Sequence, residues 1–427
     1  MTHPLVDLVR ARSRGEYESL TAVCSSHPLV LRAALRAGAR TGRRVLIEAT
    51  CNQVNHEGGY TGMQPQDFIN QVHELARSEG FDINRLVLGG DHLGPNPWRY
   101  LPADQAMAQA ETMVAGFAAA GYQKFHLDAS MRCKDDPEQL SEQEIATRAA
   151  RLAKVIEATA KPQGTPQPVY VIGTEVPPPG GANHVLDTVL PTEPEAALAT
   201  IAMHRKIFSD RGLDDAFGRV IALVVQPGVE FGDSNVYNYQ PALATRLRDV
   251  LNTEPTLGFE AHSTDYQPSL ALQHLEQDGY CILKVGPWLS FAMREALYAL
   301  DTIAGLLNTA YPSGALKSAM EELMVAKPEY WKDHYSGTDD EVHLKRHFSY
   351  SDRIRYYWNT AEATAAVDRL MNSLVGITIP ETLVSQYLPA QWRYAMQGDL
   401  RAEDLVLNAV EQALNHYPAE KKRTTAP

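Results

Sequence analysis

The chain has 427 residues, of which 44% are hydrophobic and 21% are charged, and its formal net charge is −13. This acidic balance disfavours general binding to nucleic acid or to an anionic membrane surface, because both repel a negatively charged protein. The length suits a barrel of about 250 residues with an appended region.

The chain carries no signal for secretion or for insertion into a membrane. Its first ten residues lack an uninterrupted apolar stretch, so we expect no signal peptide. The longest apolar helix, near residues 289 to 307, is interrupted by Arg294, Glu295 and Asp301, so we expect no membrane span. The four cysteines lie far apart without a Cys-x-x-Cys pair, which disfavours a disulfide scaffold or a zinc knuckle. We therefore expect a cytoplasmic protein with reduced thiols.

Eight segments are predicted to be strands, because most are continuous runs of Val, Ile and Leu, as in parallel strands covered on both faces. In chain order they are Leu20–Ser25, Arg44–Thr50, Arg85–Gly90, Lys124–Asp128, Pro168–Glu175, Val220–Gln226, Thr256–His262 and Cys281–Gly286. Helical patterns lie between them, at Pro28–Ala37, Pro65–Ser78, Ala103–Ala120, Ser141–Thr159, Glu193–Asp210, Pro241–Leu251 and Pro268–Asp278. Gly38 is a plausible stop for the first of these helices.

The alternation of eight strands with helices predicts an α/β fold, a (β/α)8 TIM barrel over residues 1–307. A doubly wound open sheet is the alternative, but the Gly-x-Gly-x-x-Gly motif typical of it is absent. Residues 308–427 contain helical stretches with many aromatic residues and no convincing strand. We expect them to form a C-terminal helical region packed on the barrel or on a partner.

Acidic and imidazole side chains stand where several predicted strands end, which is the active face of a parallel barrel. Residues i and i+2 of a strand face the same way, so His126 and Asp128 share a face, as do Glu260 and His262. Asp91 and His92 are adjacent, so both point inward only if the strand breaks there, which the flanking glycines favour. A carboxylate beside imidazoles suits a catalytic divalent metal such as zinc or manganese. The alternative is a site without metal, in which the same groups act as general acid, as general base and as hydrogen-bond partners of sugar hydroxyl groups.

Three charged residues admit other interpretations. Glu48 and Lys284 are candidates for a buried ion pair, and Asp91 could cap the following helix or bond the glycine-rich turn. Lys284 also suits the Schiff base of an aldolase, provided that burial lowers its pKa.

Phosphate sites in such barrels commonly use the loops after the last two strands and a helix start. We expect substrate or phosphate contacts there and at the end of the second strand, from Glu48, Asn52, Ser263, Asp265, Lys284, Gly286 and Arg294. Arg353 is expected to add positive charge from the C-terminal region, together with Arg355. No Gly-x-x-x-x-Gly-Lys-Ser/Thr loop is present, so an ATP site of that kind is not supported.

Long motifs at these strand ends resemble the non-catalytic (Z) subunit family of class II tagatose-1,6-bisphosphate aldolases. They include Gly89-Gly-Asp-His-Leu-Gly-Pro-Asn96, His126-Leu-Asp-Ala-Ser-Met131, Gly173-Thr-Glu-Val-Pro-Pro-Pro-Gly-Gly181 and Phe259-Glu-Ala-His-Ser-Thr-Asp-Tyr-Gln267. The resemblance runs from near Ala22 to near Pro389. It implies a barrel that acts in tagatose, galactitol or N-acetylgalactosamine catabolism and that supports a separate catalytic aldolase subunit. The family has also carried the label tagatose 6-phosphate kinase.

The resemblance also implies a ligand set. Catalytic class II aldolases bind zinc through three strand-end histidines. By position, Asp91-His92 matches their Asp-His pair and His262 matches the histidine after the seventh strand, whereas Gln226 replaces the histidine of the sixth strand. A neutral amide is a poorer zinc ligand than imidazole, so the resemblance implies weaker binding or a harder ion. Glu175 is expected as a further ligand or as a proton-transfer group.

Two hypotheses follow. In the first, the chain is an accessory subunit that stabilises a catalytic aldolase and retains a pocket for a ketohexose phosphate. In the second, it is a stand-alone 4-epimerase of fructose or tagatose 6-phosphate, in which Asp91 takes the proton of the C4 hydroxyl and C3–C4 is cleaved and re-formed. Asp128 is a further candidate for proton transfer. We also expect a homo-oligomer.

Overall fold

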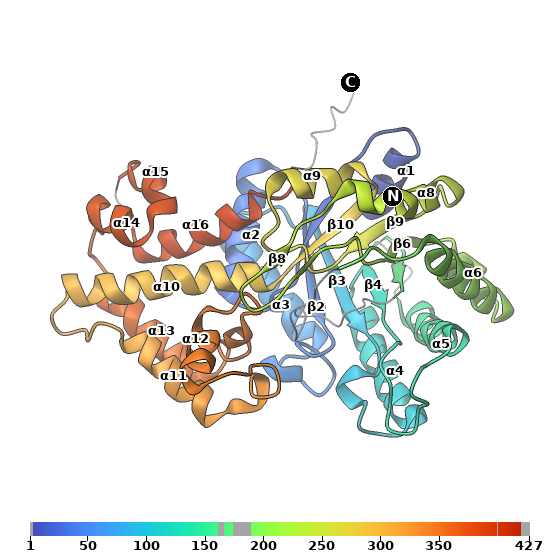
Figure 1. Cartoon of the computed structure of the whole chain (residues 1–427), viewed down its shortest axis with the longest axis horizontal. Helices are drawn as coiled ribbons and strands as arrows, with labels where there is room; N and C mark the ends of the chain where they lie inside the picture. The colour runs from blue at the N-terminus through green and yellow to red at the C-terminus, as the bar shows by residue number, and fades with distance from the viewer. Residues whose placement is uncertain (1–2, 161–165, 174–188, 399, 420–427) are drawn as a thin grey trace.

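The computed structural model describes residues 3–160, 166–173, 189–398 and 400–419. Eight parallel strands close into a barrel in the order β1-β10-β9-β6-β5-β4-β3-β2 (Figure 1). They are β1 (Leu20–Val23), β2 (Val45–Thr50), β3 (Leu86–Leu93), β4 (Lys124–Leu127), β5 (Val169–Ile172), β6 (Val220–Val224), β9 (Gly258–Ala261) and β10 (Tyr280–Val285). All eight predicted strands and the predicted (β/α)8 barrel are confirmed. The open sheet is excluded, because β1 pairs with both β2 and β10.

The barrel helices cover the outer face of the sheet. They are α2 (Pro28–Thr41), α3 (Pro65–Ser78), α4 (Ala103–Ala120), α5 (Glu142–Thr159), α6 (Pro194–Asp210), α8 (Pro241–Thr253), α9 (Ser269–Gln277) and α10 (Pro287–Leu307), with the short α7 (Asp214–Phe217) before β6. The prediction that α2 stops at Gly38 is wrong, because the left-handed residue that ends this helix is Gly42, at φ 68°. Gly38 lies inside α2, where a Cβ atom would come within 2.5 Å of Val45 Cγ2. This glycine therefore allows close packing of the helix on the sheet.

The amino end of the barrel is closed by a helix that the sequence analysis did not anticipate. Leu5, Leu8 and Val9 of α1 (Pro4–Arg12) are buried in one apolar cluster with interior strand residues such as Leu46 and Val87. Apolar side chains therefore fill this end of the barrel. A two-stranded hairpin, β7 (Glu230–Phe231) with β8 (Val236–Tyr237), follows β6 and was likewise not predicted.

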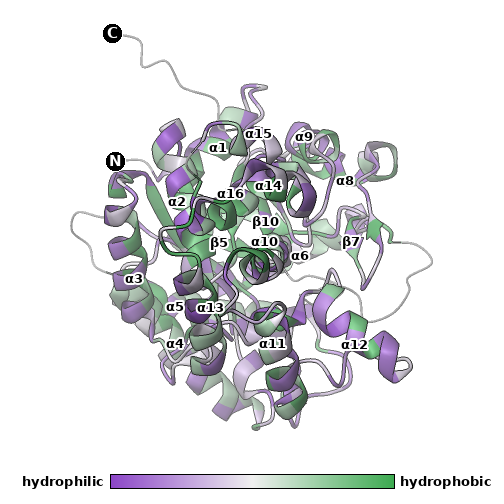
Figure 2. Cartoon of the chain, turned by 90° about the vertical axis from the view of Figure 1, so that its left-hand side faces the viewer, coloured by the Kyte–Doolittle hydropathy of each residue, from purple (hydrophilic) through white to green (hydrophobic). Residues whose placement is uncertain are grey.

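The C-terminal region is helical, and the structure shows no strand in its described part. Its helices are α11 (Ala315–Ala326), α12 (Asp339–Phe348), α13 (Ala361–Ser373), α14 (Glu381–Tyr387), α15 (Trp392–Ala395) and α16 (Ala402–Leu414), with the 3-10 turns η4 (Pro328–Tyr330), η5 (Arg353–Tyr356) and η6 (Pro389–Gln391). In Figure 2, α10 lies at the centre of these helices and is surrounded by α11, α13, α14 and α16. Since α16 also packs on α2, the C-terminal region is held against the barrel itself.

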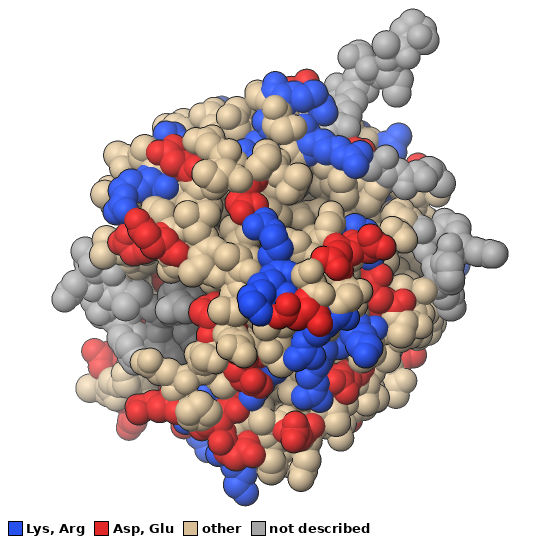
Figure 3. All heavy atoms as spheres, turned by 90° about the vertical axis from the view of Figure 1, so that its right-hand side faces the viewer, with Lys and Arg blue, Asp and Glu red and all other residues tan. Residues whose placement is uncertain are grey.

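Surface charges of both signs are interspersed on the face at the right of Figure 1, without a large patch of one sign (Figure 3). None of the helices in the described ranges combines the length and the apolar character needed to cross a bilayer.

Candidate active site

A cavity of about 500 Å³ opens at the carboxyl ends of the barrel strands. Nine of the predicted site residues line it: Asn52, Asp91, His92, Asp128, His262, Ser263, Asp265, Lys284 and Gly286. The C-terminal region completes its wall with His334, Arg355 and Tyr356. The cavity is therefore built from both parts of the chain.

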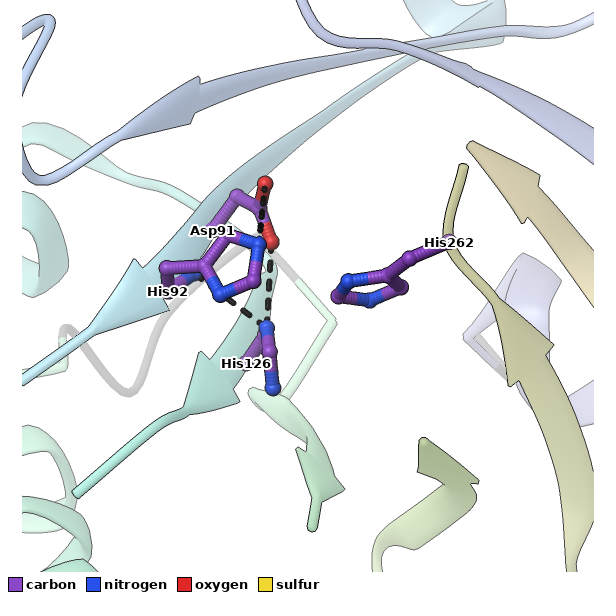
Figure 4. A group of neighbouring side chains, drawn as sticks. All are labelled: Asp91, His92, His126 and His262. Carbon is purple, nitrogen blue, oxygen red and sulfur yellow. Dashed lines mark hydrogen bonds and ion pairs between the residues drawn. The ribbon is translucent and has the colours of Figure 1, made fainter. Parts of the chain in front are cut away.

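Asp91 and His92 both face the centre of this site, as Figure 4 shows. Consecutive strand residues normally point to opposite sides. Here the pairing of β3 with β4 shifts register between Gly90 and Leu93, and His92 takes the left-handed conformation, with φ 47°. Gly94 keeps the turn close to β4, since a Cβ atom there would lie 1.7 Å from the carbonyl oxygen of Asp128. The predicted break of the strand at this point is thus confirmed as a bulge.

Three imidazoles converge beside Asp91. The ring of His126, from β4, lies 4.9 Å from that of His92 and 5.2 Å from that of His262, which follows β9 (Figure 4). The rings of His92 and His262 are each anchored through one nitrogen. His92 Nδ1 lies 2.9 Å from Asp128 Oδ2, and His262 Nε2 lies 2.9 Å from Glu260 Oε1.

The third ring is anchored by the main chain. His126 Nε2 donates to the carbonyl oxygen of Gly173 at 3.1 Å, and its Nδ1 accepts from the backbone N–H of His92 at 3.2 Å. Its Nδ1 also lies 3.0 Å from Asp91 Oδ1. Two acceptor atoms at this distance repel each other unless a proton or a cation lies between them.

A network of buried charges lies beneath the histidines. Lys124 is fully buried between two carboxylates, with Nζ 2.5 Å from Glu48 and 2.6 Å from Glu260. Lys284 Nζ contacts Asp91 Oδ1 and lies 3.7 Å from Glu48 Oε2. The expected ion pair of Glu48 with Lys284 is therefore present, although Asp91 is the nearer partner.

The environment of Lys284 argues against a Schiff base. Burial by itself lowers the pKa of this ammonium group, but Asp91, Cys24, Glu48 and Glu260 together hold the pKa well above its ordinary value. A nucleophilic lysine needs a lowered pKa instead. Lys284 is therefore a cation that faces Asp91.

The carboxylates of the site are ionised. Burial raises the pKa of Asp91, yet His92, Lys284 and His126 hold it well below the ordinary value. Burial likewise opposes ionisation of Asp128, whose pKa is lowered by His92, His126 and Ser130. Both groups are thus in the form that accepts protons or binds cations.

The donor set fits a divalent cation. Asp91, His92, His126 and His262 each offer one ligand atom, and these atoms lie within 4.8 Å of one another. Four buried carboxylates, of Glu48, Asp91, Asp128 and Glu260, face two buried ammonium groups, of Lys124 and Lys284. Carboxylates thus outnumber ammonium groups in this network, which favours a bound cation. A carboxylate that holds one nitrogen of an imidazole, as for His92 and His262, is what orients histidine ligands in metal sites.

Four predicted site residues lie outside the cavity lining. Gln226 Oε1 accepts the backbone N–H groups of Gly228 and Val229, at 2.8 and 2.9 Å, and Gln226 is not among the four converging residues. Arg294 lies 3.6 Å from Asp352 and over the ring of Phe291, outside the cavity lining.

Arg353 also lies outside the cavity lining, because its Nε donates to the carbonyl oxygen of Tyr330. Glu48 lies beneath the cavity, in the buried charge network. Glu175, the remaining predicted ligand, lies outside the described residues.

Asp265 stands at the start of α10. Its Oδ1 accepts the N–H groups of Gly286 and Trp288, at 3.0 and 2.7 Å. Burial raises the pKa of Asp265 to about 6, although these N–H groups and Arg355 oppose the shift. The carboxylate therefore occupies the helix terminus at which a phosphate was expected.

The sequence analysis missed several members of the site. His126 was placed on the correct face with Asp128 but not proposed as a metal ligand, and its strand-end position was the available signal. Lys124 and Glu260 belong to the charge network beneath the histidines. The only signal in the sequence was that Glu260 and His262 lie on the same face of their strand.

Comparison with known proteins agrees with this fold. Residues 5–422 match the family described as D-tagatose-1,6-bisphosphate aldolase subunit GatZ/KbaZ-like. The chain is 54% identical to a D-tagatose 6-phosphate 4-epimerase of Agrobacterium fabrum, over 98% of both chains. A crystal structure of a probable tagatose 6 phosphate kinase from Sinorhizobium meliloti 1021 superposes with a TM-score of 0.87 at 48% identity, covering 94% of this chain and 99% of that one. The chain therefore belongs to the GatZ/KbaZ-like family of D-tagatose-1,6-bisphosphate aldolase subunits.

Proposed function

We propose that this chain is itself an enzyme, a 4-epimerase that interconverts D-tagatose 6-phosphate and D-fructose 6-phosphate. The observation that carries the proposal is the ionised Asp91 beside three converging imidazoles and Lys284 in a cavity large enough for a sugar phosphate. A relative with 54% identity over nearly the whole chain is named for this reaction. A purely structural subunit has no physical need for four buried carboxylates in and directly beneath one cavity.

His92, His126 and His262, with Asp91 beside them, would hold a divalent cation, and that ion would supply Lewis-acid chemistry to the sugar carbonyl. Zinc and manganese both suit this mixture of imidazole and carboxylate donors. His126 takes the place that Gln226 held in the sequence prediction. Asp128 and Glu260 position the rings of His92 and His262.

The reaction requires inversion at a carbon that carries no acidic hydrogen. A base removes the proton of the C4 hydroxyl, the C3–C4 bond breaks, and its electron pair passes into an enediolate of C1 to C3. The C4 to C6 fragment becomes glyceraldehyde 3-phosphate. After the aldehyde rotates, the enediolate attacks its other face, C3–C4 re-forms, and the proton returns to the C4 oxygen. No atom or electron is gained or lost.

The chain offers a group for each requirement. Asp91 lines the cavity in its ionised form and is the proposed base, which returns the same proton after rotation. Lys284 contacts Asp91 and keeps its positive charge, so it stabilises negative charge that develops beside it.

A second candidate function is support of a catalytic aldolase subunit, since the family is described as an aldolase subunit. The two functions are compatible, because a partner can bind outside the barrel mouth. They differ in whether the isolated chain turns over substrate.

The test uses the purified chain without any aldolase. It is incubated with D-tagatose 6-phosphate in the presence of manganese, zinc or a chelator, and the sugars are separated by chromatography. We expect fructose 6-phosphate to form and the activity to be lost on chelation and in Asp91→Asn. No conversion with any metal, together with increased activity of an added catalytic aldolase subunit, would assign the accessory role instead.

A further inference from the structure

The helix terminus at which barrels commonly bind phosphate is occupied in this protein. The first N–H groups of α10 are directed at Asp265, which is 2% exposed and accepts from both Gly286 and Trp288. A phosphate dianion placed there would compete for the same donors and face the charge of the carboxylate. The phosphate therefore needs another cationic partner.

Three lysine or arginine side chains from the described residues line the cavity: Arg99, Lys284 and Arg355. Lys284 is engaged by Asp91 in the reaction centre. Arg99 is exposed to solvent, where its charge is screened. Arg355 is half-buried and has no carboxylate within ion-pair distance in the described ranges of the chain. A partly desolvated guanidinium without an anionic partner is suited to an anionic ligand.

The guanidinium of Arg355 is fixed in place by neutral groups, while the carboxylates of Asp265 and Asp352 act on it only from beyond ion-pair distance. One terminal nitrogen donates to the carbonyl oxygens of Ser351 and Asp352, and the other donates to the hydroxyl of Tyr356 at 2.8 Å. The guanidinium also lies 4.4 Å from the centre of the Tyr356 ring. These contacts already restrict the rotation of the side chain, so Arg355 loses less conformational entropy when it binds a ligand.

The segment that carries Arg355 is attached to the barrel. The ring of Tyr356 lies 5.3 Å from that of Tyr60, in the loop after β2. Asn359 donates to Ser26, after β1, at 3.2 Å. The position of the guanidinium relative to the barrel mouth is therefore set by two contacts across the boundary between the two regions.

We propose that Arg355 binds the phosphate of the ketohexose phosphate, so that the C-terminal region holds one end of the substrate while the barrel carries out the reaction at the other. The assignment rests on the proposed epimerase function. It has a mechanistic consequence, because cleavage of C3–C4 leaves the phosphate on the aldehyde fragment. Arg355 then retains glyceraldehyde 3-phosphate while its aldehyde group rotates.

The test compares Arg355→Gln with Arg99→Gln and with Lys327→Gln, a matched control that removes a surface charge paired with Glu362 in the same region. In Arg355→Gln we expect the KM for D-tagatose 6-phosphate to rise about 10- to 100-fold, the loss typical of a charge-assisted hydrogen bond. A coupled triose phosphate assay should also detect released glyceraldehyde 3-phosphate in a larger share of turnovers. Any turnover of unphosphorylated D-tagatose should be unaffected, and Lys327→Gln should resemble the wild type.

Arg355→Lys keeps the charge without the planar fork, so it should recover part of the affinity, and thermal unfolding checks that each variant is folded. An unchanged KM in folded Arg355→Gln, or a larger effect in Arg99→Gln, overturns the proposal.

Calorimetric titration with inorganic phosphate separates this proposal from the proposed function. If the wild type binds phosphate and Arg355→Gln does not, the subsite stands even when no epimerisation is found. Equal binding by both proteins, or no binding by the wild type, overturns the subsite and leaves the epimerase assay to decide the function.

Discussion

Glu260 and His262 lie two residues apart at the end of β9, and Glu260 Oε1 lies 2.9 Å from His262 Nε2. The same carboxylate lies 2.6 Å from the buried ammonium group of Lys124. One side chain thus joins the histidine at the cavity to the charge network beneath it. The carboxylate orients His262 and favours the tautomer that carries its proton on Nε2.

Replacing Glu260 with Gln should weaken metal binding about 10- to 100-fold, because the imidazole loses the carboxylate that orients it and raises its basicity. Titration of the apo-protein with zinc or manganese measures the change. Asp128→Asn removes the corresponding partner of His92 and should show a loss of similar size. Unaltered metal affinity in both variants would mean that these carboxylates do not support ligands.

The ligand set is tested by comparing His126→Ala with Gln226→Ala. His126 belongs to the converging group, so its loss should reduce bound metal to a small fraction and abolish epimerisation. Gln226 instead accepts two backbone N–H groups in its own loop, so its loss should cost about 1–3 kcal/mol of stability and leave metal binding intact. Metal content by atomic emission and unfolding by urea give the two readouts. The reverse pattern would restore Gln226 as a ligand.

Lys124→Met should lower the free energy of unfolding by about 3–5 kcal/mol, since it leaves Glu48 and Glu260 buried without their shared cation. Urea denaturation measures the loss. Lys154→Met, on the exposed face of α5, is the matched control and should change stability by less than about 0.5 kcal/mol. Equal stability of the two variants would show that the buried network is not held by Lys124.

Asp265 should make stability depend on pH. Its pKa is about 6 in the folded protein against an ordinary value of 3.8, so the folded state binds the proton more tightly than the unfolded chain. Stability from this group is therefore present below about pH 4 and is lost as the pH rises through about 6, by up to about 3 kcal/mol.

Asp265→Asn cannot titrate but keeps an oxygen for the N–H groups of α10. The free energy of unfolding of the wild type, relative to this variant, should therefore fall between pH 4 and pH 7. A difference that stays constant over this range would contradict the raised pKa.

The barrel was predictable because its strands are buried on both faces and are continuous apolar runs. The position of Asp91 and His92 was predictable from the glycines around them. Arg353 and Arg355 were predicted together to add positive charge, but the sequence could not tell which of them lines the cavity, because that depends on how η5 packs against Tyr60 and on the burial of Arg353 and Arg294 elsewhere. Local sequence does not distinguish three arginines that differ only in tertiary contacts. The helix α1, which closes the amino end of the barrel, was also not predicted, because its position depends on tertiary contacts with interior strand residues.

The central claim is that this chain alone inverts C4 by breaking and re-forming C3–C4. The most direct measurement incubates the purified, metal-loaded chain with D-tagatose 6-phosphate that carries deuterium on C4 and follows the products by NMR. We predict fructose 6-phosphate with the deuterium retained at C4, because the C4–H bond is never broken in this chemistry. Loss of deuterium from C4 would contradict carbon–carbon cleavage, and the absence of any product would contradict the assignment of the chain as an enzyme.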